Sequence, residues 1–148
     1  MYKLLLNSPV LAETWFEHVS AVRWKTELDG LTRELVIIRI GYLTRVQYVL
    51  AQHVPTYALQ EGLTLEQCDA LADWEASFLF DPRQRVILAY VDAMTLAIQV
   101  PDAVFDALRP YFTEQQIVEL SVLIGTYNMH TRVLQALDIP LERTPAAS

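Results

Sequence analysis

Apolar residues recur at the spacing of one helix face along most of the chain, and strict alternation of apolar and polar residues is rare. Recurrence at i, i+3, i+4 and i+7 is typical of amphipathic helices, whereas alternation is typical of strands. The pattern therefore predicts an all-α bundle of about six or seven helices. A length of 148 residues is typical of one domain, so we expect residues 1–148 to form a single domain.

Capping residues and prolines predict where the helices begin. Ser8-Pro9 and Asp81-Pro82 each supply an N-cap followed by a first-turn proline. Thr64 with Gln67, and Thr113 with Gln116, fit the capping box. The predicted helices span residues 9 to about 29, 31 or 32 to 44, 46 to 61, 65–74, 82–98, 102–109 and 114–136, followed by a frayed tail from 140 to 148.

Two of these helices have unusual features. The second carries the run from Leu35 to Ile38 and then Ile40, which is apolar on nearly all sides and predicts a helix buried at the centre. The third contains Pro55, which removes one backbone hydrogen bond. We expect a bend or a local split in the third helix.

Charge and composition narrow the range of partners. Eighteen acidic against 11 basic residues give a formal net charge of −7, which repels phosphate backbones, so we expect no nucleic-acid partner. No apolar run approaches the ~20 residues of a membrane span, so no membrane partner is expected. The single cysteine, Cys68, cannot form an internal disulfide, and the amino terminus has no signal-peptide pattern. A cytoplasmic location is expected.

The chain contains no glycine-rich phosphate loop, no cysteine pair and no His-Glu-x-x-His metal motif, so we predict no cofactor and no metal. Neighbouring acids raise the pKa of a thiol, and Cys68 lies between Glu66 and Asp69, so it is predicted to be a poor nucleophile. The candidates for chemistry are polar residues within apolar helices: Glu34, Arg39, Gln47, Tyr48, Gln52, His53, Tyr127, Asn128, His130 and Arg132.

Glu34 and His53 form the most promising pair. A short connection near Thr44 joins their helices, so the two residues lie about ten positions from it on antiparallel neighbours and reach a similar depth. A carboxylate that holds one imidazole nitrogen leaves the other nitrogen to move a proton near neutral pH. The alternative is a purely structural hydrogen bond. In the late helix, the polar residues from Tyr127 to Arg132 indicate a subunit interface.

Four segments together resemble the carboxymuconolactone decarboxylase-like family, which includes the alkylhydroperoxidase D proteins. They are LTRELVIIRI from Leu31, LTRVQYVLAQHVP from Leu43, EGLT from Glu61 and YNMHTRVLQAL from Tyr127. The resemblance implies an all-α fold and a homo-oligomer, commonly a trimer, hexamer or dimer. In the thiol-peroxidase branch of the family, a Cys-x-x-Cys pair occupies the positions that are Val46 and Val49 here.

The decarboxylase-like branch has acids shortly before the histidine that corresponds to His53, and the residues at those positions here are Gln47 and Val49. Of the residues that the resemblance implies for this branch, Glu34, Tyr48 and His53 are present in this chain. The resemblance implies lyase-type acid/base chemistry on a small carboxylated or lactone substrate, with His53 moving the proton, Glu34 orienting it and Tyr48 or Arg39 balancing an anionic group. The substrate-binding residues are predicted to be Arg39, Val46, Val49 and Gln52. An alkylhydroperoxidase-type enzyme and a non-catalytic binding or assembly module are the alternatives.

Overall fold

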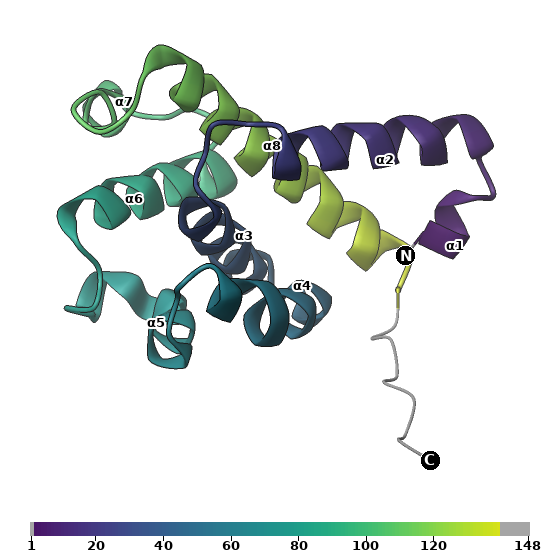
Figure 1. The fold of residues 1–148 in the computed structure, drawn as a ribbon, viewed down its shortest axis with the longest axis horizontal. Coiled ribbons are helices and arrows are strands. Elements are labelled where there is room, and N and C mark those ends of the chain that lie inside the picture. Colours follow the sequence, from purple (N-terminus) through teal and green to yellow (C-terminus); the bar gives the residue numbers. More distant parts are fainter. Residues whose placement is uncertain (1, 140–148) are drawn as a thin grey trace.

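The computed structural model describes residues 2–139 and contains no strand within that range. Figure 1 shows the helices gathered around α3, with α1 and α2 extending to one side along α8. The α-helices are α1 (Tyr2–Leu5), α2 (Pro9–Trp24), α3 (Gly30–Thr44), α4 (Gln47–Gln52), α5 (Leu65–Ala70), α6 (Pro82–Leu96), α7 (Asp102–Asp106) and α8 (Glu114–Ala136). The all-α prediction is confirmed. The predicted tail from 140 to 148 lies outside the described residues.

Helix α3 is the central element, as its sequence predicts. Every residue from Thr32 to Gly41 is buried, and the helix packs against α4, α6 and α8. The buried apolar residues on all sides of α3 therefore form the middle of the core, and each of the polar side chains of this helix needs a partner inside the protein.

The first long helix ends earlier than predicted. It stops at Trp24, and Asp29 is the N-cap of α3 rather than the end of the preceding helix, because its carboxylate accepts a hydrogen bond from the Thr32 backbone N–H. An aspartate at this position satisfies one of the orphan N–H groups of the new helix. The short α1 was not predicted. The capping boxes at Thr64 and Thr113 are both present.

The third predicted helix is split, as Pro55 led us to expect. Its first part is α4, and from His53 to Ala58 the chain forms a π-helical turn, η1. A proline within a helix removes one donor and crowds the preceding turn, and a wider turn relieves both effects. Gly62 then adopts a left-handed conformation with φ of 95°, which ends the helical segment. A 3₁₀ segment, η2 (Leu71–Ala76), extends α5.

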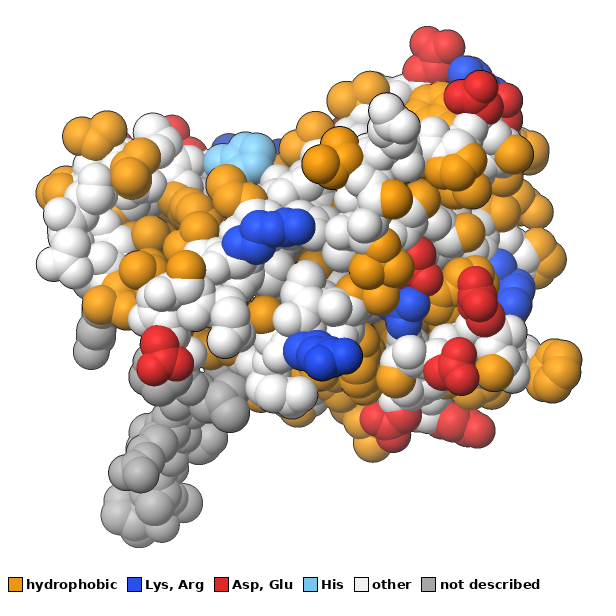
Figure 2. Space-filling view, turned by 180° about the vertical axis from the view of Figure 1, so that it is seen from behind, with side chains coloured by type: hydrophobic (Ala, Val, Ile, Leu, Met, Phe, Trp, Pro, Cys, Tyr) orange, Lys and Arg blue, Asp and Glu red, His pale blue; other side chains and the backbone are white. Residues whose placement is uncertain are grey.

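Apolar side chains remain exposed where α1, α2 and α8 meet. Figure 2 shows apolar side chains on the side of the molecule that carries α1 and α2, and others on the opposite side. We call the surface where α1, α2 and α8 meet the apolar face; it consists of Leu4, Leu6, Val10, Leu11, Phe16, Val118, Val122, Met129 and Leu137. Within residues 2–139, no helix combines the length and the apolar character that a membrane span requires.

Candidate functional site

Glu34 and His53 form a buried hydrogen-bonded pair between α3 and the start of η1. His53 Nδ1 lies 2.6 Å from Glu34 Oε2. Glu34 has no exposed surface and His53 is 7% exposed. A carboxylate can only accept a hydrogen bond, so Nδ1 carries the proton of this bond. The predicted meeting of the two side chains is therefore confirmed.

The turn between α3 and α4 brings the pair together. Arg45 ends α3 in the left-handed conformation, with φ of 58°, which reverses the chain in two residues. Gly41 permits the close return of α4, because a Cβ at this position would lie 2.9 Å from a methyl group of Leu50. Since His53 starts the π-helical turn, the irregular backbone that Pro55 causes begins at the histidine itself.

Two arginines surround the second oxygen of the Glu34 carboxylate. Arg33 Nε lies 3.3 Å from Glu34 Oε1, and Arg23 Nη2 lies 3.7 Å from the same oxygen. Arg33 also pairs with Glu61 at 2.7 Å. The cluster thus balances two carboxylates against two guanidinium groups, and the buried negative charge of Glu34 is compensated.

A cavity of about 180 Å³ opens beside the pair. We call it the His53 cavity. The His53 ring lies 5.3 Å from the ring centroid of Tyr57 and 5.8 Å from that of Tyr127, the latter edge-on. Polar and aromatic side chains therefore surround the imidazole. The lining residues are Val19, Arg23, Tyr48, Gln52, His53, Tyr57, Tyr127 and His130.

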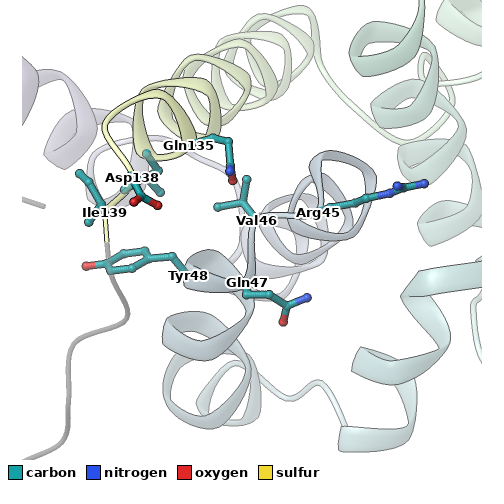
Figure 3. Close-up of a pocket in the computed structure, with 8 residues that line it drawn as sticks. Arg45, Val46, Gln47, Tyr48, Gln135, Asp138 and Ile139 are labelled. Carbon is teal, nitrogen blue, oxygen red and sulfur yellow. The ribbon is translucent and has the colours of Figure 1, made fainter.

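The structure brings only some of the predicted residues into this cavity. Tyr48 and Gln52 line it with His53. Val46 instead lines a neighbouring pocket of about 170 Å³, to which Tyr48 also belongs. Figure 3 shows Val46 and Tyr48 pointing toward the end of α8, where Ile139 lies. Val49 is buried in the core, next to Gly41.

Arg39 lies apart from the His53 cavity, and its predicted role in binding substrate does not fit its position. Its Nε and Nη2 donate to the two carboxylate oxygens of Asp92, each at 2.7 Å. Its Nη1 donates to the backbone oxygens of Leu71 and Ala72. The guanidinium is thus engaged by the protein itself, because a buried charge on a central helix needs such partners.

Two of the polar residues of α8, Asn128 and Arg132, likewise find hydrogen-bond partners within the chain. Asn128 donates to Thr95 Oγ1 and to the backbone oxygen of Ile124, and Arg132 donates to the backbone and side-chain oxygens of Asn128. Asn128 and Arg132 therefore do not need a second subunit to satisfy these groups. Tyr127 is buried against His53 and not at the surface.

Arg23 and His130 also belong to the cavity. Arg23 was not among the candidates from the sequence, and His130 was a candidate to which no role was assigned. Arg23 comes from α2, one helical turn after Val19, and His130 comes from α8, three residues after Tyr127. The spacing could have indicated that each pair shares a helix face. Only the fold shows that α2 and α8 meet at His53.

His130 is uncharged at neutral pH. Burial lowers its pKa to about 4, and the nearby His53 and Arg23 act in the same direction. The ring is 8% exposed and stacks at a tilt between Trp15 and Tyr127, at centroid distances of 5.6 and 5.5 Å. It is therefore a neutral donor or acceptor in the cavity wall.

The environment of Cys68 disfavours a role as a nucleophile. It has no exposed surface, and burial, followed by the charges of Asp69 and Glu34, raises the pKa of its thiol. The thiolate, which is the reactive form, is thus disfavoured. Among residues 2–139, no group of three His, Cys, Asp or Glu side chains is placed to hold a metal ion.

Comparison with known proteins identifies the family. The sequence profile of the Carboxymuconolactone decarboxylase family matches residues 9–93, and the chain belongs to this family. It is 32% identical over 124 residues to the uncharacterized protein YnjA of Escherichia coli, a match that covers 81% of this chain and 66% of YnjA. It is 24% identical over 115 residues to the uncharacterized protein YdfG of Bacillus subtilis, covering 76% and 78% of the two chains.

Solved structures share the fold. A protein of unknown function from Agrobacterium tumefaciens, described as an antioxidant defence protein AhpD, superposes with a TM-score of 0.88 at 22% identity, covering 95% of this chain and 97% of its own. A peroxidase-related protein from Silicibacter sp. TM1040 gives 0.85 at 21% identity, covering 95% and 75%. The debrominase Bmp8 gives 0.80 at 16% identity, covering 93% and 74%. These likenesses establish the AhpD-like fold.

Proposed function

We propose that this protein is a cofactor-free enzyme that moves a proton on a small carboxylated or lactone substrate, as a decarboxylase-like lyase. One observation carries the proposal: a buried imidazole, held at Nδ1 by a buried carboxylate 2.6 Å away, lines a cavity of the size of a small molecule. With Nδ1 engaged by Glu34, Nε2 is the nitrogen of His53 that serves the substrate.

The proposed step needs only a substrate that can accept an electron pair. The bond between the carboxylate carbon and the substrate breaks, carbon dioxide leaves, and the bonding electrons pass into the conjugated part of the substrate. His53, protonated at Nε2, then gives its proton to the carbanionic carbon and becomes neutral. Glu34 stabilises the imidazolium before this transfer through its short hydrogen bond. The next solvent proton restores His53.

Tyr48 and Gln52 are proposed to position the substrate, because both line the His53 cavity from α4. Val46 contributes apolar surface to the neighbouring pocket, and Val49 packs in the core. Neither supplies redox chemistry, since valine carries no thiol and no ionisable group. Arg39 has no part in the proposal, because Asp92 engages it.

An alkylhydroperoxidase-type activity is the second candidate, since two of the structural neighbours are described as AhpD and as peroxidase-related. The positions of the family's thiol pair are valines, and the pKa of the buried Cys68 is raised. We therefore favour the lyase. In the third candidate, a non-catalytic module, the same cavity only binds its ligand.

We also propose a homo-oligomer in which the apolar face meets a second copy of this chain. Val118, Val122 and Met129 are exposed at helical spacing on α8. Met129 lines an apolar groove of about 630 Å³ together with Leu11 of α2. Extended apolar surface of this kind marks interfaces in soluble proteins. Light scattering at micromolar concentration should find an oligomer that Val122→Glu disrupts, and a wild-type monomer would contradict this proposal.

The test of the lyase is a screen of small lactones and carboxylic acids, followed by proton NMR and carbon dioxide release. His53→Gln should abolish turnover, because glutamine keeps hydrogen bonds but cannot cycle a proton, while the free energy of unfolding changes by no more than about 1 kcal/mol. His18→Gln, a change at an exposed histidine outside the cavity, is the matched control and should retain turnover.

A reaction that is unaffected by His53→Gln would contradict the lyase. A purely structural pair would give a different result: His53→Gln and Glu34→Ala would lose much stability, and no reaction or ligand would depend on either residue. This result would also contradict the lyase.

A further inference from the structure

The two arginines beside Glu34 differ in how their donors are used. Arg33 is fully engaged: Nε faces Glu34, Nη1 donates to the backbone oxygen of Arg23 at 3.0 Å, and Nη2 donates to Glu61 at 2.7 Å. In contrast, Nε and Nη2 of Arg23 are buried and have no hydrogen-bond partner among the described residues. The 3.7 Å from Arg23 Nη2 to Glu34 exceeds hydrogen-bond length.

The position of the Arg23 guanidinium is nevertheless well fixed. It lies over the rings of Trp24 and Tyr57, with its central carbon 4.4 Å from each ring centroid. Stacking on aromatic faces holds a guanidinium without using its N–H donors. Nε and Nη2 form one edge of the guanidinium plane, and such an edge matches the two oxygens of a carboxylate. The side chain is 13% exposed and lines the His53 cavity.

His130 supplies a second, independent observation. It lines the same cavity from α8, and its Nδ1 is buried without a hydrogen-bond partner among the described residues. Buried polar atoms are seldom left unpaired, because each costs desolvation free energy that no bond returns. Two helices distant in sequence, α2 and α8, therefore present unpaired polar side chains to one cavity.

We infer that the His53 cavity is an anion site that takes a small monocarboxylate, with the Nε–Nη2 edge of Arg23 on the carboxylate oxygens and His130 as a second hydrogen-bonding group. This deepens the proposed function and rests on it for the location of the site. Glu34 is hydrogen-bonded to His53 and Arg33. Its contact with Arg23 Nη2, at 3.7 Å, is an ion pair without a hydrogen bond, so the N–H donors of the Nε–Nη2 edge are left for an added anion.

The size of the cavity limits the ligand. A cavity of about 150 Å³ holds benzene, and the His53 cavity measures about 180 Å³. A ligand with a single six-membered ring and one carboxylate is therefore near the upper limit. Aromatic side chains of the lining, Tyr48, Tyr57 and Tyr127, would contact its apolar part.

The experiment measures binding rather than turnover, on the full chain, with acetate and benzoate as probes and benzyl alcohol as the uncharged analogue. Isothermal titration should show that benzoate binds at least about tenfold more tightly than its uncharged analogue benzyl alcohol, as expected for charge-assisted hydrogen bonds. Arg23→Gln should weaken carboxylate binding by about tenfold or more, and His130→Phe should weaken it severalfold. Arg109→Gln should leave it unchanged.

Arg109 is a matched control because it also stacks on an aromatic ring, that of Phe105, and its removal changes the net charge equally, while it lies outside the cavity. Should Arg23→Gln fail to fold, as judged by circular dichroism, Arg23→Lys replaces it. Lysine keeps the charge but lacks the planar edge, so the same loss of binding is expected.

Equal affinity for benzoate and benzyl alcohol would overturn the inference. Undiminished carboxylate binding by the Arg23 variant, or no binding of either carboxylate at tens of millimolar by the wild type, would do the same. His53→Gln should still bind the carboxylate. If both the wild type and His53→Gln bind the carboxylate but neither turns over any substrate, the lyase is contradicted and the anion site still stands.

Discussion

Two buried clusters, each built around an arginine and a carboxylate, share the core of this protein but differ in how completely their groups are paired. In the first, Arg39 engages both oxygens of Asp92 and two backbone oxygens, and Trp74 Nε1 donates to Asp92 at 3.0 Å. The guanidinium donates through all three of its nitrogens. This cluster joins α3 to α6 and to the 3₁₀ segment η2.

In the second cluster, Glu34 holds His53 and faces Arg33 and Arg23. Here the pairing is incomplete. Nε and Nη2 of Arg23 and Nδ1 of His130, two residues that line the His53 cavity, have no hydrogen-bond partner among the described residues. The same is true of Nε1 of Trp15, which stacks on His130 outside this lining. A complete network fixes the fold, whereas an incomplete one beside a cavity can receive a ligand. Pairing, rather than burial or residue type, therefore separates the two clusters.

The largest effect is expected in the Arg39 cluster. Arg39→Met should lower the free energy of unfolding by about 3–5 kcal/mol, because Asp92 would remain as a mostly buried charge without its bidentate partner. Urea denaturation followed by circular dichroism measures the change, with the exposed Arg109→Gln as control. A loss below about 1 kcal/mol would show that the pair is not the structural element described here.

A smaller effect depends on pH and distinguishes the second cluster. The pKa of His130 is about 4 in the folded protein, against 6.5 in the unfolded chain, so the unfolded state binds more protons between these values. Stability is therefore complete above pH 6.5 and falls as the pH decreases toward 4. The loss attributable to His130 is about 3 kcal/mol.

His130→Phe removes this titration, so its free energy of unfolding should fall less steeply than that of the wild type between pH 6.5 and 4. Denaturation curves at half-unit pH intervals make the comparison. Parallel pH profiles for the two proteins would show that His130 is not held neutral by its burial.

The smallest expected effect concerns redox chemistry. Peroxide turnover with a dithiol reductant should stay near the uncatalysed background, because Val46 and Val49 replace the thiol pair and the pKa of Cys68 is raised by burial. Cys68→Ser should leave this background unchanged. Peroxide turnover above this background that disappears in Cys68→Ser would show that Cys68 is a redox-active nucleophile, contrary to this prediction.

The sequence predicted the elements with strong local signals. Helix α8 begins and ends where the Thr113 capping box and the helical pattern predicted, and α3 is buried on all sides as its run of apolar residues required. The Glu34–His53 pair was predictable too, because a short turn between two helices fixes the relative depth of residues on either side of it. Helix caps and short connections depend on residues that are close together in the sequence, so the sequence alone predicts them.

The rest of the site depends on contacts between distant segments. Arg39 was predicted to bind substrate because it could balance an anionic group, but its partner, Asp92, lies 53 residues away. Arg23 and His130 lie more than 100 positions apart in the sequence, and no spacing rule brings them to one cavity. Likewise, the π-helical turn at His53 follows from Pro55 only in combination with packing against α3.

The most direct test of the central claim is the protonation of the two His53 nitrogens, read by two-bond ¹H–¹⁵N NMR and assigned with His53→Gln. The structure predicts a proton on Nδ1, donated to Glu34. The nitrogen shift of Nε2 should change when benzoate is added, because this nitrogen faces the proposed substrate. A ring without a proton on Nδ1, whose nitrogen shifts are unaffected by acetate and benzoate, would contradict the account.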